Sequence, residues 1–291
     1  MGVVMSEPVV IAPVLNAPLF DAPFLKVNGT HNPHRWFLPL HENLCVGPPG
    51  RAFMFGGVGL AAGIKAMEQT CGRPVVWATA QYLSFARPPS ILDLDVWVPT
   101  QGRHNSQARV IAHVGDKEVL TINGALGSRS DAYDGQWVAA PDVPPPEACE
   151  ESDRWRGRDD DLHSRLEVRV ARGRHERAVR PRAASQDGRL VLWCRSREGQ
   201  DMDAGLLAIM ADHVPSGIGA ALGRNAGGNS LDNTIRFLRI VPTEWVLCDI
   251  TISAISGGFA HGDIRLFAPD GRLMATASQS MIVRVHDEAA T

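Results

Sequence analysis

The pattern of apolar and polar positions predicts the same series of elements twice along the chain. In the first series, small apolar residues recur at helical spacing between Phe55 and Gly72, where Gly72 and Pro74 end the helix. Alternating segments predict strands at residues 36–38, 75–84, 92–98, 107–114 and 119–125. One helix followed by consecutive strands indicates an α+β fold with an antiparallel sheet, and it excludes a doubly wound fold.

The second series has the same order. Strands are predicted at residues 166–171, 190–195, 234–240, 245–252, 261–267 and 273–285, with a helix near 204–212 and a Gly-rich stretch at 217–228. A polar segment with three consecutive prolines separates the two series and is typical of a linker. We therefore expect an N-terminal arm and first unit over 1–127, a linker over 128–162 and a second unit over 163–291.

The two series also match in sequence. ATAQYLSFAR aligns with SLDNTIRFLR when Phe85 is placed on Phe237. This alignment sets Asp232 opposite Ala80, and a similar one sets Gln279 opposite Ala125. A core that accepts alanine in one unit does not need Asp or Gln in the other, and Asp is rarely buried without a partner. The repeat therefore predicts one active site per chain, in the second unit.

These segments resemble those of the bacterial acyl-CoA thioesterase II family and its double hotdog relatives. The resemblance rests on SLDNTIRFLR with EWVLCDI and DGRLMATASQSMIVR in the second unit, and on FMFGGVGLAAG and AQYLSFARPP in the first. LVLWCRSREG followed by LLAIMADHVP extends it, so that residues 50–127 and 163–286 are covered. The resemblance implies two tandem hotdog units, each an antiparallel sheet wrapped around a central helix, and hydrolysis of an acyl-CoA to the free acid and CoA.

The resemblance also implies site residues. In the family an Asp, a Thr or Ser, and a Gln orient the water that attacks the thioester carbonyl. Asp232 and Gln279 match the Asp and the Gln. For the hydroxyl, Ser253 is the first choice, Ser256 the second and Thr251 the third. The resemblance makes Asp212 a structural residue.

A developing oxyanion needs N–H donors, which the first turn of a helix offers together with a favourable dipole. Because FGGVG opens the first predicted helix, Gly57 and Val58 are the candidate donors.

Composition narrows the function classes. The net charge of −3, from 29 basic and 32 acidic residues, argues against a nucleic-acid partner. Five scattered cysteines without a CxxC pair predict neither disulfides nor a metal site, and they favour a cytoplasmic location. No basic segment precedes an apolar run at the N-terminus, and we expect no membrane-spanning segment. No cofactor is expected, and the resemblance implies a dimer or higher homo-oligomer with acyl-CoA as substrate.

Two alternatives remain open at this stage. The chain could be a non-catalytic protein that binds acyl thioesters, or a hotdog enoyl-CoA hydratase. The hydratase is disfavoured because Asp212 and His213, as adjacent helix residues, point about 100° apart and are poorly placed to act as a pair.

Overall fold

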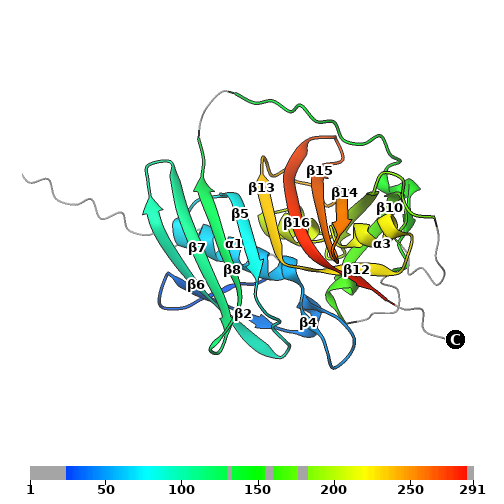
Figure 1. Ribbon diagram of the computed structural model, residues 1–291. Helices are drawn as coiled ribbons and strands as arrows, with labels where there is room; N and C mark the ends of the chain where they lie inside the picture. Colours follow the sequence, from blue (N-terminus) through cyan, green and yellow to red (C-terminus); the bar gives the residue numbers. More distant parts are fainter. Residues whose placement is uncertain (1–23, 130–132, 155–159, 176–182, 287–291) are drawn as a thin grey trace, which may run out of the picture.

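The computed structural model describes residues 24–129, 133–154, 160–175 and 183–286. Two halves lie side by side, and in each half a curved sheet packs against a helix (Figure 1). The elements of the first half are β1 (Asn28–Gly29), β2 (Arg35–Leu40), η1 (Glu42–Leu44), β3 (Cys45–Val46), β4 (Phe53–Met54), α1 (Gly56–Cys71), β5 (Val75–Tyr82), β6 (Ser90–Gln101), β7 (Asn105–Val114) and β8 (Lys117–Gly127). The strands predicted from alternation in this half are thus present, each within a few residues of its predicted bounds.

The second half repeats this order. Its elements are η3 (Leu162–Arg165), β10 (Leu166–Arg172), β11 (Arg189–Ser196), α2 (Ala204–Ala211), α3 (Ser216–Leu222), β12 (Ala226–Ser230), β13 (Asp232–Phe237), β14 (Val246–Ser256), β15 (Phe259–Phe267) and β16 (Leu273–Val285). Two short elements, η2 (Pro146–Ala148) and β9 (Glu150–Glu151), lie in the predicted linker. The Gly-rich stretch at 217–228, which carried no element in the prediction, forms most of α3 and the start of β12.

The two halves form one continuous antiparallel sheet. The strand order β2-β6-β7-β8-β5 in the first half recurs as β11-β14-β15-β16-β13 in the second. The halves join where β5 pairs with β13, with Thr79 opposite Thr234 and Gln81 opposite Asp232. This arrangement is a double hotdog fold, as the sequence predicted.

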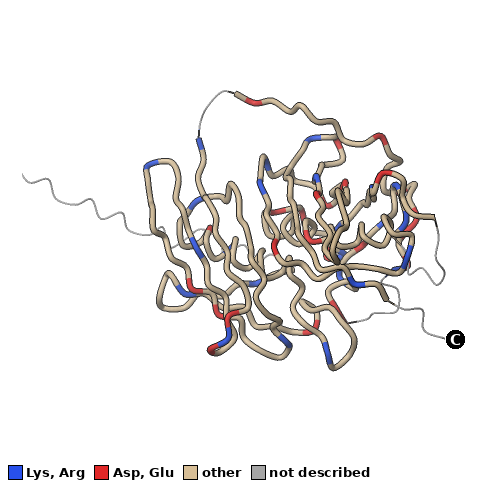
Figure 2. Tube along the Cα trace, viewed as in Figure 1, with Lys and Arg blue, Asp and Glu red and all other residues tan. Residues whose placement is uncertain are grey.

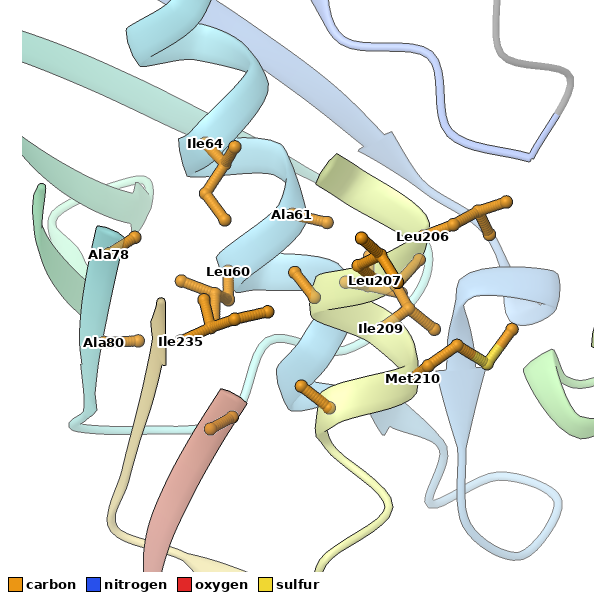
Figure 3. Packing of buried hydrophobic residues seen from close by; sticks show 14 of the residues in the cluster. Leu60, Ala61, Ile64, Ala78, Ala80, Leu206, Leu207, Ile209, Met210 and Ile235 are labelled. Atoms are coloured by element: carbon orange, nitrogen blue, oxygen red, sulfur yellow. The ribbon is translucent and has the colours of Figure 1, made fainter. Parts of the chain in front are cut away.

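The central helices α1 and α2 pack against each other between the sheet halves. Ala61 of α1 points toward Leu206 and Leu207 of α2 (Figure 3). Leu60 and Ile64 lie on the side of α1 that faces the strands, where the buried residues are Ala78, Ala80 and Ile235. The small residues of FGGVGLAAG permit this close packing. At Gly57 a Cβ would come within 2.9 Å of the Ile209 Cα and 3.0 Å of the Asp212 Cβ. The glycine therefore sets how closely the two helices approach.

The observed strands correct the alignment between the halves. Ala80 points into the core and is 1 % exposed, and on β13 the core-facing residues are Asn233 and Ile235. Asp232 precedes Asn233 and is half-buried on the other face of the strand. Because side chains alternate along a strand, a slip of one residue reverses the face. The alignment of Asp232 with Ala80 is therefore off by an odd number of residues.

The described part of the predicted linker lies along the second half. Gln136 donates a hydrogen bond to the Gly271 carbonyl and accepts one from the Leu273 amide. Trp193 donates through its indole to the Pro144 carbonyl at 2.9 Å. Ala140 and Val143 cover a small apolar cluster on the outer face of the sheet, whose buried members are Cys149, Val191, Trp193, Leu247, Phe267 and Leu273. This segment therefore closes a second, smaller core and does more than connect the halves.

Residues 1–23 of the predicted N-terminal arm lie outside the described residues. Its end crosses to the second half, where the Arg165 guanidinium lies 3.9 Å from the Phe24 ring centre and donates to the Phe24 carbonyl.

One apolar run is longer than the sequence analysis allowed. Residues 204–222 have a mean hydropathy of 1.3, and by length and composition alone they could cross a membrane. In the structure this run divides into α2 and α3, and 72 % of it is buried inside the protein. It is the core helix segment of the second half.

Candidate active site

A buried carboxylate lies where the two halves meet. Asp212 is the residue that ends α2, and it is 5 % exposed. Its side chain faces the first turn of α1, so that groups from both halves surround it. A carboxylate at the C-terminus of a helix is disfavoured by the helix dipole, and a buried one is costly unless it is hydrogen bonded. Asp212 therefore needs compensating partners.

Three donors supply this compensation. The Gln279 amide donates through Nε2 to Asp212 Oδ1 at 2.6 Å. The Gly57 backbone N–H donates to Oδ2 at 2.7 Å, and the Ser230 hydroxyl lies 3.4 Å from Oδ1. Gln279 comes from β16 and Ser230 from the end of β12, whereas Gly57 comes from the other half of the protein. The structure thus assembles an Asp, a Ser and a Gln.

The environment changes the pKa of this carboxyl group. Burial raises the pKa of Asp212 to about 6, and the hydrogen bonds from Gln279, Gly57 and Ser230 oppose the rise. A carboxyl group with a pKa near 6 is ionised at neutral pH and still accepts a proton readily. This is the property that general-base catalysis requires.

The glycines at the start of α1 make room for this arrangement. A Cβ at Gly56 would lie 2.8 Å from Asp212 Oδ2 and 3.1 Å from the Tyr82 hydroxyl oxygen. Gly56 therefore separates two polar side chains that come from different halves. Any larger residue would displace one of them.

The structure brings only part of the predicted site together. Gln279 is core-facing, 3 % exposed, and bonded to Asp212. Asp232 is half-buried, and its Oδ1 accepts from the Ser280 backbone N–H at 2.7 Å. Gln279 thus bonds to Asp212, and this geometry favours Asp212 over Asp232 as the carboxylate of the site. Asp212, which the resemblance made a structural residue, is therefore a candidate site residue as well.

The predicted hydroxyl residues lie elsewhere. Ser253 is exposed at an irregularity of β14, where it donates to Asp263, and Ser256 is exposed at the end of that strand. Thr251 is half-buried and pairs with Asp263 in the sheet. The hydroxyl that reaches the Asp212 carboxylate belongs to Ser230, which the sequence analysis did not consider. It stands two residues before Asp232 in the very segment that carried the resemblance.

The predicted oxyanion donors are engaged within the protein. The Gly57 N–H donates to Asp212, and the Val58 N–H donates to the Phe55 carbonyl at 3.0 Å. Neither group points to a substrate oxygen in this structure. The first turn of α1 holds the carboxylate instead.

His213 does not act together with Asp212. Its Nδ1 lies 3.1 Å from the Met210 carbonyl, and its ring lies beside that of Phe55. Burial lowers the pKa of His213 to about 4, so the imidazole is neutral at physiological pH. This agrees with the expectation that the adjacent pair is no hydratase dyad.

Comparison with known proteins identifies the class of this fold. A crystal structure described as a candidate thioesterase from Novosphingobium aromaticivorans DSM 12444 is 36 % identical, with a TM-score of 0.79, and the match covers 88 % of this chain and 97 % of that one. The family model of the acyl-CoA thioesterase C-terminal domain matches residues 142–283. The chain therefore belongs to the acyl-CoA thioesterase family with the double hotdog fold.

More distant structures share the fold. An acyl-CoA thioesterase II from Mycobacterium marinum is 18 % identical, with a TM-score of 0.68 and coverage of 91 % of this chain and 98 % of that one. A hotdog protein of unknown function from Alicyclobacillus acidocaldarius is also 18 % identical, with a TM-score of 0.76 and coverage of 94 % and 100 %. No curated protein matches the chain.

Proposed function

We propose that this protein hydrolyses an acyl-CoA to the free acid and CoA, with Asp212 as the general base. The observation that carries the proposal is the buried Asp212 carboxylate, which has a pKa raised to about 6 and is bonded to Gln279 and Gly57. Membership of the thioesterase family supports the same reaction class.

The polar atoms around Asp212 suit a water molecule. The Gln279 amide nitrogen is used by Asp212, whereas its Oε1 is buried without a partner among the described residues. A water placed between the two residues would donate one proton to the carboxylate and the other to Oε1. Its lone pair would then be free to attack, and the Ser230 hydroxyl would help to hold the carboxylate in place.

The reaction follows in two steps. Asp212 takes a proton as the water oxygen bonds to the thioester carbon, which gives a tetrahedral intermediate. The carbon–sulfur bond then breaks, the carbonyl forms again, and the CoA thiolate takes the proton back from Asp212. Neither step uses a metal or a covalent enzyme intermediate.

Release of free CoA thiol from acyl-CoAs of several chain lengths tests the proposal. We expect turnover by the wild-type protein and a loss of about 10²–10⁴-fold in Asp212→Asn. Asp232→Asn is the matched control, because an Asn oxygen still accepts from the Ser280 N–H, and it should keep most of the activity. Binding of acyl-CoA without any thiol release would instead support a non-catalytic thioester-binding protein.

Loss of turnover in Asp232→Asn but not in Asp212→Asn would overturn the assignment of the base. It would return that role to the residue that the repeat pattern indicated.

A further inference from the structure

Three residues around Asp212 carry buried polar atoms that have no hydrogen-bond partner within the described part of the chain. They are the hydroxyl of Tyr82, both side-chain polar atoms of Asn233, and Oε1 of Gln279. Asn233 is 0 % exposed. Most buried polar groups in proteins are hydrogen bonded, so several unpaired ones in one place need an explanation.

The strand register gathers these residues on the inner face of the sheet. Asn233 pairs with Ala80 on β5, and Tyr82 lies two residues further along that strand, on the same face. On the other side of β13, Thr234 pairs with Ser278, so that Asn233 and Gln279 are the next pair along the two strands. A polar row therefore runs across the seam between the halves, from Tyr82 through Asn233 to Gln279.

Tyr82 reaches the carboxylate from the first half. A Cβ built on Gly56 would lie 3.1 Å from the Tyr82 hydroxyl oxygen and 2.8 Å from Asp212 Oδ2, so the two polar groups approach the same space beside this glycine. The Asn233 amide lies close enough to the hydroxyl to lower its pKa, while neither group has a hydrogen-bond partner among the described residues. If Tyr82 and Asn233 only filled space in the core, Phe at the first position and Leu at the second would fill it equally well and would leave no polar atom unpaired.

We infer that the Tyr82 hydroxyl and the Asn233 side-chain amide bind the carbonyl oxygen of the thioester and stabilise the oxyanion that forms from it. The inference rests on the proposed hydrolysis. It assigns to two side chains the task that the Gly57 and Val58 amides, already engaged, do not perform in this structure.

The donors and acceptors divide as the reaction requires. Asp212 and Gln279 Oε1 are acceptors and suit the two protons of the attacking water. The Tyr82 O–H and the Asn233 N–H are donors and suit an oxygen that gains negative charge as the water oxygen bonds to the carbon. When the carbon–sulfur bond breaks, the electron pair of the oxyanion forms the carbonyl again, the negative charge leaves with the CoA thiolate, and the donors release the neutral carbonyl oxygen.

The surroundings keep Tyr82 in its donating form. Burial and, next in importance, the Asp212 carboxylate raise the pKa of the Tyr82 hydroxyl well above its ordinary value, while the Asn233 amide opposes the rise. The hydroxyl therefore keeps its proton at neutral pH, where Asp212 is ionised.

Kinetics of Tyr82→Phe and Asn233→Leu test the inference. Each variant keeps the size of the side chain and removes the donor, and we expect kcat to fall about 100-fold. Thr79→Val is the control, because it removes a hydroxyl that bonds Thr234 across the same seam at 2.7 Å, away from Asp212. The control should keep the wild-type kcat.

Binding separates a role at the carbonyl from a structural one. Hexanoyl-CoA has two stable analogues, namely the ketone in which a methylene replaces the sulfur, and S-hexyl-CoA, which has no carbonyl. Calorimetry should show that Tyr82→Phe and Asn233→Leu each weaken the binding of the ketone about tenfold or more. The affinity of both variants for S-hexyl-CoA should stay unchanged. Their melting temperatures should equal or exceed that of the wild type, because an unpaired buried group is removed.

The outcomes are distinct. Wild-type turnover together with unchanged kinetics and ketone binding in both variants would show that an ordinary water satisfies these atoms, and would overturn the inference alone. Equal weakening of both analogues, or melting temperatures well below wild type, would also overturn it by showing a structural role. Absence of any turnover in the wild type would instead overturn the proposed function.

Discussion

Asp212 shows how a single residue can indicate a site, because its position is unfavourable in free energy. It combines two unfavourable conditions, burial and the C-terminus of a helix, and its partners come from three separate segments. Its position after the apolar segment LLAIMA could have drawn attention to it in the sequence. The contacts that distinguish it from Asp232 could not be predicted, because they depend on which face of β13 points inward.

The pKa of Asp212 predicts the pH dependence of turnover. A general base acts only when it is deprotonated, so kcat/KM should be constant at neutral pH and fall tenfold per pH unit below about 6. Measurement of thiol release between pH 4.5 and 8 checks this. A profile that stays flat down to the ordinary range of a surface carboxylate, near pH 4, would contradict the role of a buried base.

The partners of Asp212 should contribute unequally. Gln279→Leu removes both the short bond to the carboxylate and the free Oε1, so we expect kcat to fall at least tenfold. Ser230→Ala removes only a longer contact of 3.4 Å, and a smaller loss of about two- to fivefold is expected. The kcat values of the two variants, measured on one substrate, check this order. A larger loss in Ser230→Ala would mean that the hydroxyl itself touches the water.

At the scale of elements, α1 shows how sequence determines the distance between helices. The strands and the main helices could be predicted because alternation and helical spacing are strong local signals. Helix α3 and strand β12 could not, because a run of glycines suggests a loop unless the packing partner is known. The alignment of the β5 segment with the β13 segment was also out of reach, because so short a match does not fix it and a slip of one residue reverses the face of every side chain.

Two glycines of α1 offer a matched pair of substitutions. In Gly57→Ala the new Cβ meets the Ile209 Cα at 2.9 Å and the Ala208 carbonyl, both backbone atoms that cannot yield without moving α2. We expect a loss of about 1–3 kcal/mol in the free energy of unfolding and a fall in kcat. In Gly59→Ala the Cβ meets only the ends of the Met54 and Leu120 side chains.

Because those side chains can adjust, and Ala favours helix over Gly by up to about 1 kcal/mol, Gly59→Ala should be nearly neutral in stability and activity. Denaturant unfolding and thiol release on both variants check the pair. Equal stability of the two would show that the helix contact is not set by Gly57.

At the scale of the whole molecule, the two halves share one fold but carry different side chains on the inner faces of their sheets. In the first half the inner face of β8 carries Leu120, Ile122 and Leu126, so nothing corresponds there to Gln279. Charged residues of both signs are scattered over the described parts of both halves (Figure 2). Each half nevertheless supplies atoms to the candidate site, Gly57 and Gly56 from one and Asp212 from the other.

This asymmetry predicts the binding stoichiometry. Calorimetric titration with S-hexyl-CoA should give one site per chain. Two equivalent sites per chain would contradict the assignment, because the inner face of β8 carries apolar side chains and no counterpart of Gln279. The repeat in the sequence predicted one site with Asp232 as its carboxylate, whereas the hydrogen bonds in the structure favour Asp212.

The seam between β5 and β13 also bears on how such a protein can change over time. Two separate identical subunits would have to carry every substitution in both copies, so a new residue at one site would appear at the other. Once the copies share one chain, each can vary independently. The first half can then carry apolar side chains on β8 where the second half has Gln279, and still place Tyr82 beside the Asp212 carboxylate of the second half.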